Sequence, residues 1–223
     1  MTIHGVSRTL YRHRFEEASL PAKKRIWEVL CRHFFQRYVD PDATVLDLGA
    51  GYCEFLHGIR CSERIAVDLN PDVRSFAPDG TRIVLAPSTA MDEVGEATVD
   101  VVFASNFFEH LPNTEAFLDT LVEIRRVLRP GGRLLVLQPN IAAVGGQYWD
   151  FLDHHLPLTE KTVVEGLEVS GFEVREVRAR FLPYTTKSRL PQHPALVRIY
   201  LRVPIAHRLL GGQAWVVAET PDR

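Results

Sequence analysis

Two carboxylates and a glycine turn mark the part of this sequence that is best suited to hold a ligand. The apolar stretch Thr44–Leu48 contains Asp47 and leads directly into Gly49-Ala50-Gly51. Glycines let a backbone turn sharply and approach a ligand closely. Asp68 ends the next apolar stretch, 21 residues after Asp47, where a carboxylate can accept hydrogen bonds from both hydroxyls of a ribose. We therefore expect a ligand that contains a nucleoside at this turn.

The charges around the turn restrict the ligand further. A dinucleotide-binding turn has the pattern GxGxxG, with a small residue in the sixth position and a helix N-terminus open to pyrophosphate. Here the sixth position is Glu54, whose carboxylate would repel a pyrophosphate. Together with Asp47, it favours a cofactor that is positively charged and has no phosphate, such as S-adenosylmethionine. A nicotinamide-dependent oxidoreductase on a similar sheet remains the alternative.

Three histidines could act as general bases. His110 follows Glu109 just beyond the strongest apolar stretch of the chain, and His154 and His155 directly follow Asp153. Histidine titrates near neutral pH, and a neighbouring carboxylate can hold its ring in the tautomer that a base requires. Transfer of a sulfonium methyl group to oxygen or nitrogen releases a proton. These three histidines are therefore the candidate catalytic residues, and a purely structural role in their loops is the alternative for each.

These residues need a scaffold that brings them to one place. Apolar, β-branched stretches alternate with amphipathic ones, which predicts a parallel sheet with helices on both faces. Ligands of such sheets bind at the carboxyl ends of the strands. We expect strands at 44–48, 64–69, 82–85, 99–105, 133–137, 172–181 and 214–219. We expect helices at 21–38, 52–60, 114–128 and 159–169, and a further apolar, arginine-containing segment at 195–210.

Four stretches give the sequence a family resemblance. They are VLDLGAGYCEF (45–55), IAVDLNP (65–71), VDVVFASNFFEHLPN (99–113) and EIRRVLRPGGRLLVLQPN (123–140). Over roughly residues 40–181 the chain resembles the class I S-adenosylmethionine-dependent methyltransferases. The resemblance implies a three-layer αβα, doubly wound, seven-stranded and mostly parallel sheet whose last strand is antiparallel. It also implies methyltransferase activity with S-adenosylmethionine as cofactor.

The resemblance also assigns residues to the cofactor. Asp47, Gly49 and Gly51 would border the methionine moiety, Asp68 the ribose, and Asn106 the methionine end. The loop after the third strand would meet the adenine, where this chain offers Ser88 or Thr89 in place of an acidic residue. The expected cofactor-binding residues are Asp47, Gly49, Ala50, Gly51, Asp68, Leu69, Ser88, Thr89 and Asn106.

Two departures from the family pattern affect the site. The third glycine of the first motif is replaced by Cys53, whose small side chain we expect to be tolerated. Some relatives hold a divalent metal with an ExxEH run after the fourth strand, and a helix would place those positions on one face. Here Asn106 stands in the first position, ahead of Glu109 and His110, so the run is less negatively charged. We therefore predict no metal site.

Composition limits the partners. The 223 residues carry a net charge of −2, with 46% hydrophobic and 24% charged side chains, as in an ordinary globular protein. A sequence pI near 6.5 argues against a general nucleic-acid binder. Three cysteines without a CxxC pair and an N-terminus without an apolar leader favour a reducing, cytoplasmic location. We expect a small-molecule acceptor, methylated most simply on oxygen, with a non-catalytic S-adenosylmethionine-binding module as a further alternative.

Three regions complete the predicted organisation. We expect residues 1–40 to form an N-terminal helical lid and 41–223 to form the S-adenosylmethionine-binding domain. An insertion at 181–212 would separate the last two strands on the substrate side. Within it, 195–210 could lie on a membrane surface as an interfacial helix, and the alternative is a helix packed on the sheet with its arginines outward. By analogy with relatives found beside glycan-building enzymes, the acceptor could be glycosylated or lipid-linked.

Overall fold

The computed structural model describes residues 20–184 and 193–222. Its strands are β1 (Thr44–Leu48), β2 (Glu63–Val67), β3 (Arg82–Val84), β4 (Val99–Ser105), β5 (Leu128–Pro139), β6 (Glu173–Arg178) and β7 (Gln213–Glu219). Its α-helices are α2 (Leu20–His33), α3 (Glu54–Gly58), α4 (Thr114–Val127), α5 (Ile141–Val144), α6 (Glu160–Val169), α7 (Pro194–Tyr200) and α8 (Pro204–Leu210). Short 3-10 helices are η2 (Phe35–Tyr38), η3 (Pro71–Ser75), η4 (Phe108–His110) and η5 (Gly145–Asp150).

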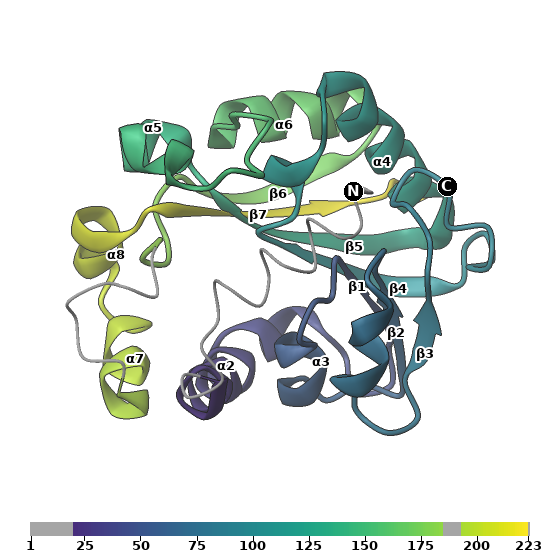
Figure 1. The fold of residues 1–223 in the computed structure, drawn as a ribbon, viewed down its shortest axis with the longest axis horizontal. Coiled ribbons are helices and arrows are strands. Elements are labelled where there is room, and N and C mark those ends of the chain that lie inside the picture. The colour runs from purple at the N-terminus through teal and green to yellow at the C-terminus, as the bar shows by residue number, and fades with distance from the viewer. Residues whose placement is uncertain (1–19, 185–192, 223) are drawn as a thin grey trace.

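The strands form one sheet in the order β3-β2-β1-β4-β5-β7-β6. Strands β1 to β5 pair in parallel, whereas β7 is antiparallel to both of its neighbours. The predicted fold class is therefore confirmed, and Figure 1 shows the three layers. The strand order reverses between β1 and β4, so the loops after these two strands meet at the topological switch point where such sheets bind ligands.

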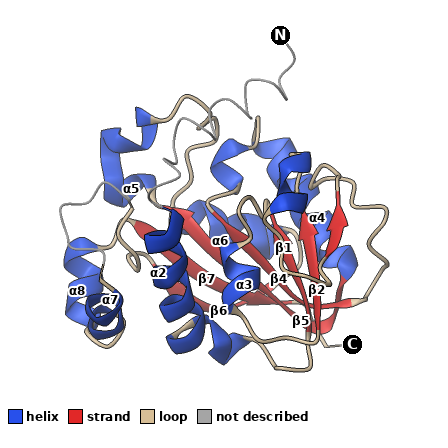
Figure 2. Ribbon diagram, turned by 60° about the horizontal axis from the view of Figure 1, so that its bottom comes forward, coloured by secondary structure: helices blue, strands red, loops and turns tan. Residues whose placement is uncertain are grey.

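Helices cover both faces of the sheet because its central strands are apolar on both sides. Successive strand residues point to opposite faces. Val45 belongs to the core that includes residues of α2 and α3, and Leu46 belongs to the core that includes residues of α4 and α6. Figures 1 and 2 show these helix pairs on opposite sides of the sheet. The site at the strand ends therefore rests on a core that is packed from above and below.

A cluster of aromatic rings joins the N-terminal helical segment to the sheet. Trp215 on β7 is fully buried. Its ring centroid lies 5.3 Å from that of Phe34, 5.3 Å from Phe35 and 5.2 Å from Tyr38. Within the predicted lid at 1–40, residues 1–19 lie outside the described residues. The described remainder contributes these rings to the core of the domain.

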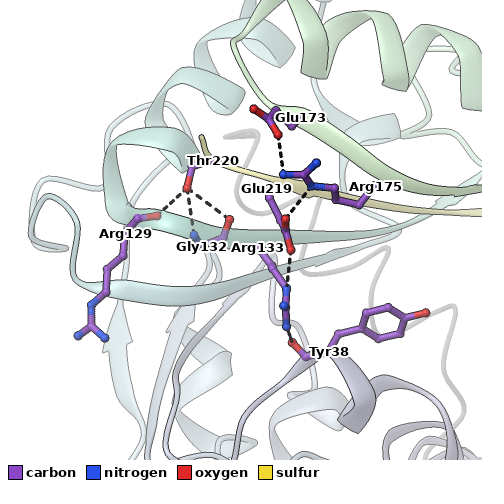
Figure 3. A network of polar contacts seen from close by, with 8 residues as sticks. All are labelled: Tyr38, Arg129, Gly132, Arg133, Glu173, Arg175, Glu219 and Thr220. Carbon is purple, nitrogen blue, oxygen red and sulfur yellow. Dashed lines mark hydrogen bonds and ion pairs between the residues drawn. The ribbon is translucent and has the colours of Figure 1, made fainter. Parts of the chain in front are cut away.

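The RPGG stretch forms the start of β5, and a polar network fastens it to the end of β7 (Figure 3). The Gly132 amide donates to the Thr220 hydroxyl at 3.0 Å. Glu219 accepts from Arg133 at 2.9 Å and from Arg175 at 2.7 Å. This network lies at the amino end of β5, at the edge of the sheet opposite the glycine turn. The RPGG motif, the most distinctive of the sequence, therefore has a structural role.

Some element boundaries differ from those predicted. The segment 195–210 is two short helices, because Pro204 at the start of α8 cannot continue a preceding helix. The helix predicted at 21–38 ends at His33 and gives way to η2. Strand β5 begins at Leu128 rather than 133, since the paired register shifts near its start and so accommodates the glycines.

Candidate active site

The glycine turn after β1 is packed directly against the loop that follows β4. Gly49 has φ +68°, and a Cβ added there would lie 2.4 Å from Cδ2 of Phe107. Its amide donates to the Val67 carbonyl at 2.8 Å, which links the turn to the end of β2. A glycine is therefore required both by the backbone angle and by the close approach of the ring. Cys53, in place of the third glycine, has φ 55°, a conformation that costs about 1 kcal/mol for a residue with a side chain.

Two carboxylates lie beside this turn, as the sequence predicted for the residues after β1 and β2. Asp47 is buried, and its pKa is raised well above the usual range by burial first and then by Glu54 and Asp68. Asp68 accepts from the Gly51 amide and the Asn70 amide, each at 2.8 Å. Burial raises the pKa of Asp68 while these backbone donors oppose the rise. Burial thus disfavours the charged form of both carboxyl groups, and a cation bound at the turn would stabilise that form.

Glu54 adds less to this charge than the sequence suggested. Its carboxylate forms an ion pair with Lys23 of α2 at 2.7 Å. Opposite charges at this separation attract, so the field of Glu54 at the turn is partly neutralised. The electrostatic preference for a cationic cofactor thus depends chiefly on Asp47 and Asp68.

The remaining predicted cofactor residues occupy different environments. Ala50 is buried within the turn, and Leu69 is exposed beyond β2. Ser88 is buried, and its hydroxyl is hydrogen-bonded to that of Thr120 on α4 at 2.7 Å. That hydroxyl is therefore already engaged away from the loop surface, whereas Thr89 is exposed.

Asn106 holds the loop after β4 in an unusual conformation. Its φ is 48°, a left-handed angle that asparagine tolerates better than most residues. Its Oδ1 accepts from Gln213 Nε2 at 2.8 Å, at the start of β7. Asn106 is thus turned toward β7, and the chain continues into η4, which ends in Glu109 and His110.

Three side chains from two loops meet beyond the end of β4. The ligand atoms of Glu109, His110 and His154 all lie within 4.8 Å of one another. Glu109 is only 1% exposed, and its Oε1 lies 3.9 Å from His110 Nε2. The rings of His110 and His154 are 5.1 Å apart, and His154 also stacks on Phe151. The structure thus unites two of the three histidines that the sequence singled out.

Asp153 orients the His110 ring. His110 Nδ1 lies 2.9 Å from the Asp153 carbonyl oxygen and 3.4 Å from the Asp153 carboxylate. A carbonyl oxygen can only accept, so in the neutral ring Nδ1 carries the proton and Nε2 keeps its lone pair. Burial raises the pKa of Glu109, while His110 opposes the rise.

His155 lies apart from this arrangement. Its backbone amide donates to the Glu109 carbonyl at 2.8 Å, and its side chain is exposed. Gln138, which the sequence did not single out, instead approaches the cluster by donating from Nε2 to Glu109 Oε2 at 2.9 Å. Its only signal was a polar residue near the end of an apolar strand, which is too common to identify a site.

A cavity of about 280 Å³ lies along the same edge of the sheet. Its lining comes from α5, from the segment after β6 and from the end of α8, and includes Val144, Arg180, Tyr184, Leu209 and Gly212. The aromatic residues at 148–151 do not line it: Tyr148 is fully buried, and Trp149 is 53% exposed. Arg180 and Tyr184 gave no motif in the sequence, because their proximity to α5 arises only in the fold.

A protein-family model for the methyltransferase domain matches residues 46–136. No curated protein matches the chain. Among solved structures, a chain of the complex between the Haloferax volcanii Trm112 methyltransferase activator and a methyltransferase is similar. It has a TM-score of 0.70 and 16% identity, over 95% of this chain and 97% of that one.

Two further structures share the fold. A SAM-dependent methyltransferase from Archaeoglobus fulgidus has a TM-score of 0.62 and 20% identity, over 88% of this chain and 94% of that one. A methyltransferase from Bacillus halodurans has a TM-score of 0.62 and 17% identity, over 86% and 98% respectively. The sheet order, the glycine turn and the matched domain together define a methyltransferase whose cofactor is S-adenosylmethionine. Residues 46–136 thus carry a methyltransferase domain, and the fold around it is that of the class I S-adenosylmethionine-dependent methyltransferases.

Proposed function

We propose that the protein transfers the methyl group of S-adenosylmethionine to an oxygen atom of a small-molecule acceptor. The observation that carries this proposal is the cluster of Glu109, His110 and His154. It lies in the loops that follow β4 and β5, at the same edge of the sheet as the glycine turn after β1. Methyl transfer from a sulfonium needs alignment of nucleophile, methyl carbon and sulfur. An oxygen nucleophile also needs a group that accepts its proton.

The cofactor would lie across the switch point of the sheet. Asp47, Gly49, Ala50 and Gly51 would border its methionine part, and Asn106 would close that end. Asp68 and Leu69 would hold the ribose. The adenine would lie along 86–89, contacted by Thr89 and by backbone groups at Ser88, because the Ser88 hydroxyl is bonded to Thr120.

His110 is the best placed of the three histidines to receive the proton. Asp153 fixes its Nδ1, which leaves Nε2 as the acceptor atom. His154 is buried beside it and would support its position, whereas exposed His155 lies apart and would take no part in proton transfer. The cavity lined by Arg180 and Tyr184 would receive the body of the acceptor.

A panel of acceptors tests this function. Purified protein is incubated with S-adenosylmethionine carrying a labelled methyl group and with phenolic, sugar and lipid-linked acceptors, and the products are identified by mass spectrometry. We expect label on an acceptor oxygen. Label on nitrogen or carbon, or on a macromolecule alone, would contradict the acceptor assignment.

Asp68→Ala is expected to weaken cofactor binding by about 1–3 kcal/mol, or roughly 5- to 150-fold, because the ribose hydroxyls lose a charged acceptor. Calorimetry with S-adenosylhomocysteine measures the change. Asp79→Ala, at an exposed turn before β3, is the matched control and should bind like the unmodified protein. Equal affinity of the Asp68 variant and the control would refute the ribose assignment.

A lipid-linked acceptor fits the surface of α7 and α8. Arg198, Arg202 and Arg208 are exposed on or between these two helices, and neither helix contains an acidic residue. Leu196, Ile199, Ile205 and Leu209 are exposed on the two helices, Leu209 to 73%. Within the described residues no helix is long and apolar enough to cross a membrane. Basic and apolar side chains exposed together favour reversible contact with an anionic membrane surface, and Leu209 also lines the cavity.

Flotation with vesicles tests this contact. We expect the protein to float with vesicles that contain anionic lipid and not with neutral ones, and Leu209→Ser combined with Ile205→Ser to reduce flotation. Arg208→Lys, which keeps the charge, is the control. No flotation with either vesicle would remove the membrane proposal and leave the methyltransferase assignment intact. Because all three cysteines are free, we place this contact on the cytoplasmic side.

A further inference from the structure

We propose that Glu109, His110 and His154 bind a divalent transition-metal ion. The sequence alone could place only Glu109 and His110 together, and it predicted no metal. The fold adds His154, from a loop 44 residues further along the chain than His110, and brings the three ligand atoms to within 4.8 Å of one another.

The distances between the ligand atoms are close to those of a single bound metal ion. Zinc binds histidine nitrogen at about 2.0–2.1 Å and carboxylate oxygen at about 2.0–2.2 Å, so two ligands of one ion lie less than about 4.3 Å apart. The 3.9 Å between Glu109 Oε1 and His110 Nε2 already meets this limit. A pair separated by the full 4.8 Å would have to approach by about half an ångström or more, which small rotations of the side chains can supply.

Neighbouring groups present the ligand atoms. Asp153 holds His110 Nδ1, which leaves the lone pair of Nε2 available. Gln138 donates to Glu109 Oε2, which leaves Oε1 toward His110. Metal-binding histidines usually donate their other ring N–H to a carbonyl or carboxylate, and metal-binding carboxylates are themselves hydrogen-bonded. This cluster has both features.

Charge and hydrogen bonding also favour a cation here. The Glu109 carboxylate is almost fully buried, and its contact with His110 Nε2, at 3.9 Å, is with a ring that carries no charge in the tautomer described above. A buried carboxylate is stabilised by a paired charge or a metal. The Oε1 atom of Gln138 is buried and has no hydrogen-bond partner within the described part of the chain. Water bound to an ion would supply a donor for it.

The ligand types select the ion. Two imidazoles and one carboxylate suit zinc, cobalt, iron or manganese, whereas magnesium and calcium prefer oxygen ligands alone. Three protein ligands leave positions open for water or for an acceptor oxygen. The catalytic use of such an ion rests on the proposed function: an acceptor hydroxyl bound to it would lose its proton more readily. Because His110 Nε2 would then be coordinated, the ion would replace that nitrogen in promoting proton loss, and the proton would pass to water. Binding of the ion does not depend on that function.

Titration of the metal-free protein with Co²⁺ alone tests the site. Cobalt bound to histidine nitrogens with a low coordination number gives visible absorption, and competition with Zn²⁺ gives the affinity for zinc. We expect one equivalent to bind, His154→Ala to weaken binding by at least about tenfold, and Glu109→Gln to do the same. His155→Ala, an adjacent exposed histidine, is the matched control and should bind like the unmodified protein.

Three results would overturn the proposal. They are the absence of a cobalt spectrum, loss of binding in the His155 variant equal to that in the His154 variant, and binding unchanged in both ligand variants. Circular dichroism of each variant separates loss of binding from loss of folding. The metal titration contains no acceptor, so its failure is distinct from failure of the methyltransferase assay. If the metal-free protein methylates its acceptor at the full rate, the ion has no part in proton removal.

Discussion

His110→Ala is expected to lower kcat for methyl transfer by about 10²- to 10⁴-fold, the usual contribution of a positioned proton acceptor. The reason is the geometry around Nε2. Asp153 holds the ring at Nδ1, which leaves the Nε2 lone pair as the proposed proton acceptor, and alanine removes it. The same loss is expected if Nε2 holds an ion. Measured with the acceptor found in the panel, kcat should fall while the affinity for S-adenosylhomocysteine stays within twofold or so.

The controls separate chemistry from structure. His155→Ala changes an exposed histidine in the same loop as His154 and should keep near-normal kcat. Asp153→Asn retains the backbone carbonyl that holds Nδ1, so it should lose much less than His110→Ala. If His110→Ala retained the full kcat with an unchanged melting temperature, the proton would leave by another route, and the catalytic assignment of this cluster would be wrong.

The fold could be predicted largely from the sequence because its strands are short, apolar and separated by clear breaks. β1 and β4 begin and end where the pattern placed them. The helix predicted at 195–210 was wrong in its extent. The apolar pattern continues through Pro204, but the helical backbone breaks before this proline, so two short helices form. Periodicity reports which residues face the interior, whereas proline decides where a helix starts.

The site was predictable only where it is local in sequence. The glycine turn and Asp68 follow directly from the ends of β1 and β2. The cluster is different, because Glu109 and His154 meet only after β5 and the loop behind it have folded back. Likewise, the ion pair of Glu54 with Lys23 could not be read from spacing, since α2 precedes β1 in the chain but packs beside α3.

Trp215→Ala is expected to destabilise the protein by about 3–5 kcal/mol, the usual cost of deleting a buried aromatic side chain. Trp215 is 0% exposed, and it packs against the rings of Phe34, which follows α2, and of Phe35 and Tyr38 in η2. For a chain of this length each kcal/mol corresponds to about 2–4 °C. The melting temperature, followed by circular dichroism, should therefore fall by roughly 6–20 °C. Trp149→Ala is the matched control, because that ring is 53% exposed, and surface changes usually stay within about 0.5 kcal/mol.

The size of this effect also distinguishes two views of the N-terminal helical segment. If residues 20–38 form one cooperative core with the sheet, loss of Trp215 lowers the single unfolding transition of the whole domain. If they act instead as a lid that opens independently, loss of the ring contacts to Phe34 and Phe35 frees the segment and leaves the main transition near its original temperature. The rings of Phe34 and Phe35 each lie 5.3 Å from that of Trp215, and all three residues belong to the same buried core. We therefore expect the first outcome. An unchanged main transition with early protease cleavage near α2 would instead support a lid.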